Sequence, residues 1–326
     1  MPNKLLLTFD VEDFINDESV GALHFILKLL KKHSVKALFF ITGHMAEKLR
    51  NFQPTLNMLA DHEIGFHSSA HSVHPTIFEY CDIENYDNAY SISLERETSH
   101  INPLSGEIEG PGGLRALRDL LPHKSIKAYR APGHCCPPPN LEAMATLGIR
   151  YDFSWNFARV PVHYKGMTLY PHPVFPDCEK ALLIDKNDTV HPLLFLRSIC
   201  TAKMTLLNFH PDRLVNKEWW DGIYHNGNPS RLHEVVARNA EQRRRMSTRM
   251  ETLLKVICRL EKLGVITTSP ILNTSGERLD LAKVNVCKAV DTFTSWPRTF
   301  FSYKPKHLYP QFSRFFECDL GQAMYA

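Results

Sequence analysis

The sequence predicts an α/β protein built on a parallel sheet or barrel, and three observations lead to this prediction. Short apolar runs of strand length alternate with helical patterns along most of the chain, which is typical of parallel βα units. The length of 326 residues suits either two average domains or one large α/β barrel. A composition of 44% hydrophobic and 22% charged residues indicates a globular protein with a sizeable core.

The first third of the chain predicts three buried strands separated by helices. Each strand is an apolar run, KLLLTFD, VKALFFITG or EIGFH, as expected of a parallel sheet that is buried on both faces. Asp17 or Ser19 caps the first helix, and Pro54 begins the second. The strands are expected at residues 4–10, 35–43 and 63–67, with helices through Leu30 and Leu59.

The same alternation continues to about residue 271. Seven apolar residues from Met246 to Leu263 mark one face of a long helix that ends at Gly264. Further strands are expected at residues 127–133, 149–155, 203–211 and 265–271, and further helices at 88–100, 140–148 and near 193–202. We therefore expect a single domain, residues 1–279, followed by an aromatic and basic C-terminal extension, residues 280–326.

Charge, cysteine content and hydropathy argue against several classes of protein. A formal net charge of +3 is too small to indicate nucleic acid binding. The eight cysteines show no CxxC pair and no disulfide spacing of a small secreted domain. No run reaches the ~18 apolar residues of a transmembrane helix, and the first residues do not resemble a secretory signal. We expect a cytoplasmic protein with free thiols. The sequence does not indicate an oligomeric state.

Polar side chains follow the predicted strands at the points where the strands end. In a βα barrel the C-terminal ends of the strands converge on one face, so these side chains are expected to lie together. They are Asp10, Glu12 and Asp13 after the first strand, His67 and His71 after the third, Arg130 after the fourth, Asp152 and Trp155 after the fifth, and His210 after a later one.

His67 and His71, in the run HSSAH, predict a metal site. Since the chain has 17 histidines, two histidines four residues apart could occur by chance. The prediction depends on their position directly after a predicted strand. Two imidazoles on one helical turn face the same way, and a carboxylate from the first strand would complete three ligands. The ion would activate a water molecule and polarise a carbonyl group. Asp10 suits the general base and His210 the acid that protonates the departing amine, so hydrolysis of an amide or ester is expected.

Six motifs resemble, in this order, those of the NodB-type polysaccharide deacetylase family: LLTFDVEDF, KALFFITG, HEIGFHSSAH, YRAPG, RYDFSW and LLNFHP. The resemblance spans residues 4–270 and implies a distorted (β/α) barrel of about seven units in a single domain. It implies a metal-dependent hydrolase that removes an acetyl group from an N-acetylated sugar or glycan. One divalent ion is implied, zinc in the first place, although this ligand set also accepts cobalt, nickel or iron.

Carried over by position, the resemblance gives roles to individual residues. Asp10 becomes the general base, oriented by Arg130, and His210 the general acid, tuned by Asp152. The other implied residues are His67 and His71 as metal ligands, the backbone N–H near Gly133 as an oxyanion donor, Trp155 as a pocket wall, and Leu206 and Leu207 as the lining of the acetyl slot.

The third metal ligand has two candidates. The usual first motif of the family has two adjacent aspartates, where this chain has DVED. A family branch with Asp-x-Asp points to Glu12, whereas an aspartate ligand would be Asp13. We favour Asp13 for its residue type.

Two other functions fit the same residues. The resemblance also includes hydrolases of small cyclic amides or ureides, so an allantoinase-like enzyme is one alternative. A carbohydrate-binding relative without catalysis is the other. The expected partner is a carbohydrate or a small N-acyl substrate, and a groove open at both ends would suit a polymer whereas a closed pocket would suit a small ring.

Overall fold

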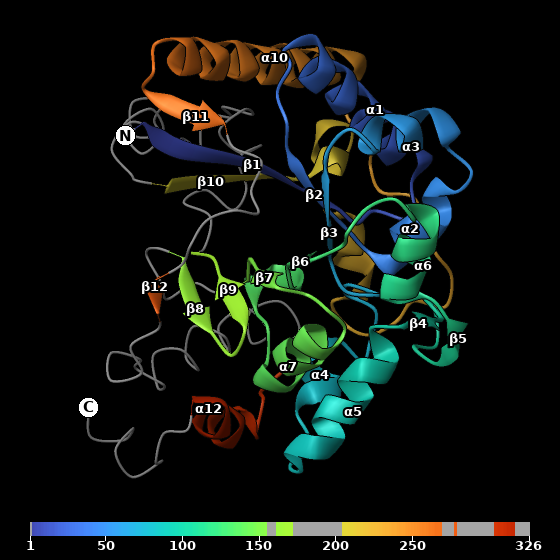
Figure 1. Cartoon of the computed structure of the whole chain (residues 1–326). Helices are drawn as coiled ribbons and strands as arrows, with labels where there is room; N and C mark the ends of the chain where they lie inside the picture. Colours follow the sequence, from blue (N-terminus) through green and yellow to red (C-terminus); the bar gives the residue numbers. More distant parts are fainter. Residues whose placement is uncertain (1, 155–160, 172–203, 269–276, 279–302, 317–326) are drawn as a thin grey trace.

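A curled sheet of mainly parallel strands forms the centre of the molecule (Figure 1). The computed structural model describes residues 2–154, 161–171, 204–268, 277–278 and 303–316. The strands of the main sheet are β1 (Asn3–Val11), β2 (Leu38–Ile41), β3 (Glu63–Phe66), β6 (Ala128–Tyr129), β7 (Tyr151–Asp152), β8 (Val162–Tyr164), β9 (Met167–Leu169), β10 (Met204–Phe209), β11 (Ile266–Thr268) and β12 (Glu277–Arg278).

The strand order within the described residues is β10-β1-β2-β3-β6-β7-β9-β8-β12, and β11 also pairs with β1. Each neighbouring pair from β10 to β9 is parallel, whereas β8 runs antiparallel to β9. The predicted α/β class and the distorted barrel are therefore confirmed, with a half-barrel sheet in the described residues.

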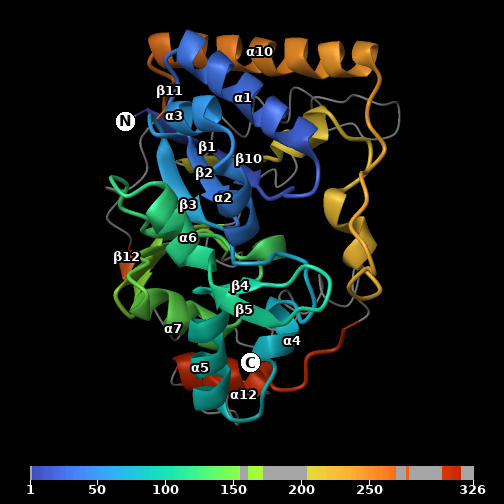
Figure 2. The ribbon, with the colours of Figure 1, turned by 90° about the vertical axis from the view of Figure 1, so that its right-hand side faces the viewer.

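Helices cover the convex side of this sheet. Figures 1 and 2 both show α10 lying along α1 at one end of the molecule. The α-helices are α1 (Asp17–Lys32), α2 (Gly43–Leu49), α3 (Gln53–Leu59), α4 (Ile77–Cys81), α5 (Tyr86–Arg96), α6 (Gly113–Leu120), α7 (Pro138–Thr146), α10 (Ala240–Lys262) and α12 (Leu308–Phe316). The 3-10 helices are η1 (Pro132–His134), η2 (Pro211–Leu214) and η3 (Trp220–Tyr224), and a small hairpin consists of β4 (Ser99–Ile101) and β5 (Ile108–Pro111).

Alternate residues of the strands face two separate apolar clusters. Leu7 and Phe9 of β1 pack with the helices in the larger cluster, whereas Leu6 packs with Phe40 and Leu206 in a smaller one. Because successive side chains of a strand point to opposite faces, the smaller cluster forms the floor of the concave interior. The interior residues that follow along β1 are polar, so the floor of the half barrel is apolar and its C-terminal end is not.

The structure adds elements that the sequence patterns did not predict. The antiparallel pair of β8 and β9 falls in a stretch without regular periodicity, and α4 precedes the predicted helix. The helix predicted near residues 193–202 and the pocket residue Trp155 lie outside the described residues.

The described part of the C-terminal extension packs against α4, α5 and α7. The Gln311 amide donates to the carbonyl oxygen of Cys81 at 2.7 Å, and the Tyr303 hydroxyl donates to Asp82 Oδ2 at 2.7 Å. Phe312, Phe315 and Phe316 are buried in the larger apolar cluster, between the sheet and its helices.

No helix in the described part of the chain is both long enough and apolar enough to cross a membrane.

A pair of glycine substitutions tests how closely α6 approaches the loop after β3. A Cβ on Gly113, where φ is +52°, would lie 2.0 Å from Ser69 Oγ and 2.5 Å from the carbonyl oxygen of Glu97. We expect Gly113→Ala to lower the free energy of unfolding by at least about 2 kcal/mol, measured by urea denaturation.

The control is Gly21→Ala in α1, where a Cβ meets nothing within 4 Å. Alanine favours the helix, so this variant should gain about 0.5–1 kcal/mol. A Gly113→Ala protein as stable as the wild type would show that the close approach does not exist.

Candidate metal centre

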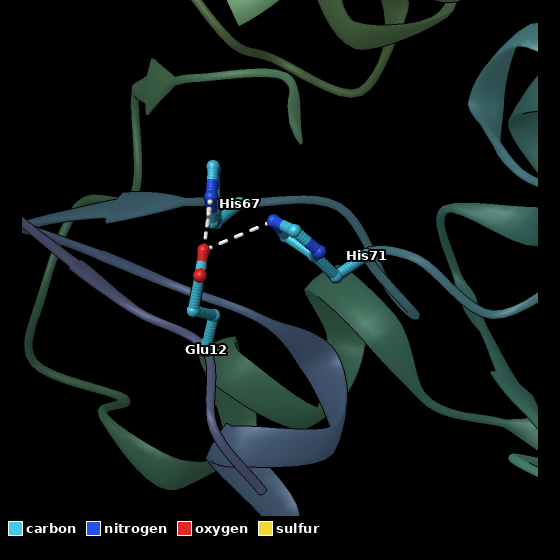
Figure 3. Close-up of side chains that lie close together, drawn as sticks. All are labelled: Glu12, His67 and His71. Carbon is cyan, nitrogen blue, oxygen red and sulfur yellow. Dashed lines mark hydrogen bonds and ion pairs between the residues drawn. The ribbon is translucent and has the colours of Figure 1, made fainter. Parts of the chain in front are cut away.

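Glu12, His67 and His71 converge at the C-terminal end of the sheet (Figure 3). Glu12 Oε2 lies 3.1 Å from His67 Nε2 and 3.0 Å from His71 Nε2. One possible ligand atom of each residue lies within 4.8 Å of the other two, and all three residues are buried. In the part of the chain that the structure describes, this is the single group of His, Cys, Asp and Glu side chains able to share a metal ion.

A tight turn, and not a helix, brings the two histidines together. β3 ends at Phe66, and the backbone then takes positive φ angles at Ser68 (67°) and His71 (44°). The imidazole centroids lie 5.2 Å apart as a result. The predicted convergence is therefore found, but the predicted helical turn is wrong, because a reversal of the chain also brings residues four apart onto one side.

Contacts on the outer side of each imidazole decide which nitrogen faces the cluster. His67 Nδ1 lies 2.7 Å from the Arg130 carbonyl oxygen, which can only accept, so Nδ1 donates its hydrogen there. His71 Nδ1 lies 2.7 Å from Ser72 Oγ, whose own hydrogen is donated to Asp221. With Nδ1 engaged, each imidazole turns Nε2 towards Glu12, and Nε2 is the nitrogen that would bind a metal ion after giving up any proton that it holds.

The electrostatics of the cluster suit a cation. Burial would raise the pKa of Glu12, but His71 and His67 outweigh burial and hold that pKa well below its ordinary value. Burial would lower the pKa of His71, but the Glu12 carboxylate outweighs this effect and raises it. A divalent ion would take the place of the proton that the cluster otherwise attracts. Catalytic zinc sites have three protein ligands, and two imidazoles with one carboxylate are one such set, so these residues fit the predicted metal.

Asp13 turns away from the histidines and holds the start of α1. Its Oδ1 accepts from the backbone N–H of Asn16 at 3.1 Å, and its Oδ2 accepts from the hydroxyl of Ser19. Because both oxygens are engaged at the helix start, the preference for Asp13 as the third ligand is corrected. Glu12, the other candidate, is the carboxylate that lies beside both imidazoles.

Asp10 lies next to the cluster and is held by two buried donors. Arg130 Nη1 donates to Asp10 Oδ1 at 2.7 Å, and Asn208 Nδ2 donates to Asp10 Oδ2 at 2.7 Å. Burial would raise the pKa of Asp10, but Arg130 and the nearby imidazoles of His67 and His210 outweigh it and keep this pKa far below the ordinary value. Asp10 is therefore ionised, and the predicted pair with Arg130 is present.

His210 approaches Oδ2 of Asp10, the oxygen that accepts from Asn208. His210 Nε2 lies 3.6 Å from Asp10 Oδ2, and His67 Nε2 lies 4.0 Å from it. The His210 imidazole meets the Trp219 ring edge-on, with centroids 5.0 Å apart. The predicted base thus lies between one metal-ligand candidate and the predicted acid.

Asp152 lies on the helix-covered side of the sheet. Its partners on the neighbouring strands are Tyr129 of β6 and Leu169 of β9. Both partners pack in the larger apolar cluster under the helices, so Asp152 faces the same side. Its carboxylate accepts from the backbone N–H and the hydroxyl of Ser154 at 3.1 and 2.8 Å. His210 lies on the concave side, so this placement does not support the predicted role of Asp152 in tuning His210.

Two further predictions about the pocket have different outcomes. Gly133 lies in η1, which follows β6, with φ of 60°, and the role of its backbone N–H as an oxyanion donor stays a prediction. Leu206 faces the concave interior, whereas Leu207 packs under the helices. Adjacent residues of a strand face opposite sides, so Leu207 cannot line an acetyl slot together with Leu206.

Sequence reasoning missed several side chains that support the site. Asn208 lies within the quoted motif LLNFHP and holds Asp10. Ser72, Trp220 and Asp221 contact the ligand candidates. The run EWWDG carries Trp220 and Asp221 but has no strand or helix periodicity. The two adjacent tryptophans were its sole unusual feature.

Comparison with known proteins gives one family match. Residues 2–107 match the family model described as "Polysaccharide deacetylase", which confirms the resemblance predicted from the motifs. This segment contains Asp10, Glu12, His67 and His71. No curated protein sequence matches the chain significantly.

Solved structures with a similar arrangement include two esterases and a mutant of a pseudoenzyme. A CE4 esterase from Streptococcus mutans has 15% identity and a TM-score of 0.44, over 82% of this chain and 85% of that one. A family 4 carbohydrate esterase from Streptomyces lividans has 11% identity and a TM-score of 0.41, over 85% and 98%. A mutant, with restored activity, of a CE4 family pseudoenzyme from Bacillus anthracis has 16% identity and a TM-score of 0.42, over 85% and 70%. The strand topology of the chain itself defines the fold.

The burial of Asp152 predicts a pH dependence of stability. Burial raises the pKa of Asp152 from 3.8 to about 7 in the folded protein. The folded state therefore holds the proton more tightly than the unfolded state, and the stability that this proton supplies is present below pH 4 and is lost as the pH rises towards 7. Asp152→Asn should remove this loss, so that the variant gains stability relative to the wild type between pH 4 and 7.

The measurement is the free energy of unfolding of both proteins at several pH values. The relative gain should reach a few kcal/mol, since one pKa unit corresponds to about 1.4 kcal/mol. Parallel stability curves for the two proteins would contradict the burial of an uncharged Asp152.

Proposed function

On the premise that residues 2–107 match the polysaccharide deacetylase family model, we propose that this protein is a metal-dependent hydrolase. It removes the acetyl group from an N-acetylated sugar or glycan. The observation that carries the proposal is the position of Asp10, whose Oδ2 lies 4.0 Å from His67 Nε2 and 3.6 Å from His210 Nε2. This position supports the proposal because the proposed base, the proposed acid and the candidate metal centre lie around one point.

Glu12 Oε2 and the Nε2 atoms of His67 and His71 would hold the ion. When bound, a divalent ion such as zinc makes water more acidic and polarises the carbonyl group of the substrate. The three side chains offer one atom each, which leaves room for water and substrate beside them.

Asp10 accepts the proton of the attacking water through Oδ2. Oδ2 is the oxygen that faces His67 and His210. It accepts from Asn208 at 2.7 Å, and its second lone pair can take up the proton while Arg130 holds Oδ1 at 2.7 Å. The water oxygen forms a bond to the acetyl carbon, and the C–N bond of the amide then breaks. His210 donates a proton to the departing nitrogen, which leaves as the amine, and acetate is the other product.

Asp10→Asn tests the role of Asp10 as base. Asparagine keeps an oxygen for Arg130 but cannot take up a proton, so we expect kcat to fall by about 10²–10⁴-fold while the metal stays bound. The assay is acetate release from N-acetylglucosamine oligomers with zinc or cobalt added. Asp119→Asn, on the exposed face of α6, is the control and should keep the wild-type rate.

Wild-type activity in the Asp10→Asn protein would remove Asp10 as the base. A wild-type protein that binds metal but neither releases acetate from these oligomers nor opens the ring of small cyclic amides would contradict hydrolysis and leave the non-catalytic alternative.

Metal content tests the ligands independently of turnover. We expect about one divalent ion per chain in the wild type, and loss of that ion in His67→Ala with His71→Ala, by elemental mass spectrometry of purified protein. Asp13→Asn should keep the ion, since Asp13 faces α1. Metal that persists in the double histidine variant would place the ion elsewhere.

A further inference from the structure

We propose that Ser72, Trp220 and Asp221 form a brace that fixes the metal ligands and restricts Glu12 to one coordinating oxygen. The inference rests on the proposed metal centre and concerns side chains that no motif assigned. Trp220 and Asp221 begin η3, in the segment that follows β10 and His210. All three brace residues are buried.

Trp220 engages the oxygen of Glu12 that does not face the histidines. Its indole Nε1 donates to Glu12 Oε1 at 2.9 Å, whereas Oε2 lies 3.1 and 3.0 Å from the Nε2 atoms of His67 and His71. An indole N–H can only donate, so this contact keeps Oε1 as an occupied acceptor. Glu12 is thereby presented through Oε2 alone.

Ser72 and Asp221 orient the imidazole of His71 by a short chain of hydrogen bonds. His71 Nδ1 lies 2.7 Å from Ser72 Oγ, and Ser72 Oγ donates to Asp221 Oδ2 at 2.6 Å. The carboxylate lies 3.8 Å from His71 Nδ1 itself. This chain keeps the hydrogen on Nδ1 and leaves Nε2 as the nitrogen that would bind a metal ion, the arrangement by which a carboxylate supports a metal-bound histidine.

η3 is fixed to the turn that carries His71, so the brace and the ligands form one unit. His74 Nε2 lies 2.6 Å from the Tyr224 carbonyl oxygen at the end of η3. Asn228 accepts from the His74 backbone N–H and donates to its carbonyl oxygen, both at 2.7 Å. Trp220 also packs on the His71 ring, with centroids 5.3 Å apart. A side chain held in this way can define ligand geometry because it has little freedom of its own.

The experiment measures the affinity of the metal-free full-length protein for zinc and cobalt by chelator competition. Trp220→Phe removes the N–H and keeps most of the packing, and Ser72→Ala breaks the chain to Asp221. Each should weaken metal binding by about 10–100-fold. The control Tyr224→Phe removes a buried hydroxyl of the same helix, which donates to Pro103 at 3.1 Å, and should leave the affinity within about twofold of wild type. Circular dichroism of each metal-free variant checks folding.

The visible spectrum of bound cobalt gives a reading that a purely structural effect would not change. Trp220→Phe frees Glu12 Oε1, so the coordination number of cobalt can rise and its absorption bands should weaken, whereas Ser72→Ala should leave band intensity close to wild type. Wild-type affinity in both Trp220→Phe and Ser72→Ala would overturn the brace. Metal binding that depends on the brace, in a protein without acetate release, would support this inference and contradict the proposed function alone.

Discussion

Burying a carboxylate away from water costs several kcal/mol unless a counter-charge or donors compensate, and two acidic groups lie side by side at this site. Asp10 and Glu12 are 2% and 4% exposed. Arg130 provides one positive charge and pairs with Asp10, so Glu12 depends on other partners. Two imidazoles and one indole N–H surround Glu12. This excess of buried negative charge explains the arrangement of the surrounding side chains and leaves an electrostatic requirement that a divalent cation would meet.

The half barrel places the charged layer above an apolar floor. Leu6, Phe40 and Leu206 fill the floor of the concave interior, and the Arg130 guanidinium lies 4.2 Å from the centroid of the Phe40 ring. With water excluded below, Arg130 has its polar contacts with Asp10, Asn208 and Thr8. The apolar floor therefore directs the guanidinium towards Asp10. Which polar residues share the interior follows from the alternation of side chains between the two faces of each strand.

Much of the fold and of the site followed from the sequence because strand ends are visible as apolar runs that stop at polar residues. Asp10, His67, Arg130 and His210 all follow such runs, and the structure brings them together. The choice between Glu12 and Asp13 depended on the backbone path after β1. The side chains of these adjacent residues point in different directions there, Glu12 towards the histidines and Asp13 towards α1. Trp220 and Asp221 reach the site from a segment without periodicity, and only tertiary packing brings that segment to Glu12 and His71. Asp152 and Leu207 were misplaced because a motif does not reveal on which side of a short strand a residue lies.

The most direct test of the account is anomalous diffraction from crystals of the full-length protein grown with zinc or cobalt, measured at the absorption edge of the added metal. The account predicts one strong anomalous peak in contact with Glu12 Oε2, His67 Nε2 and His71 Nε2, with Glu12 Oε1 still on the Trp220 indole. A peak coordinated by Asp13, or no peak at the two histidines in metal-saturated crystals, would contradict it.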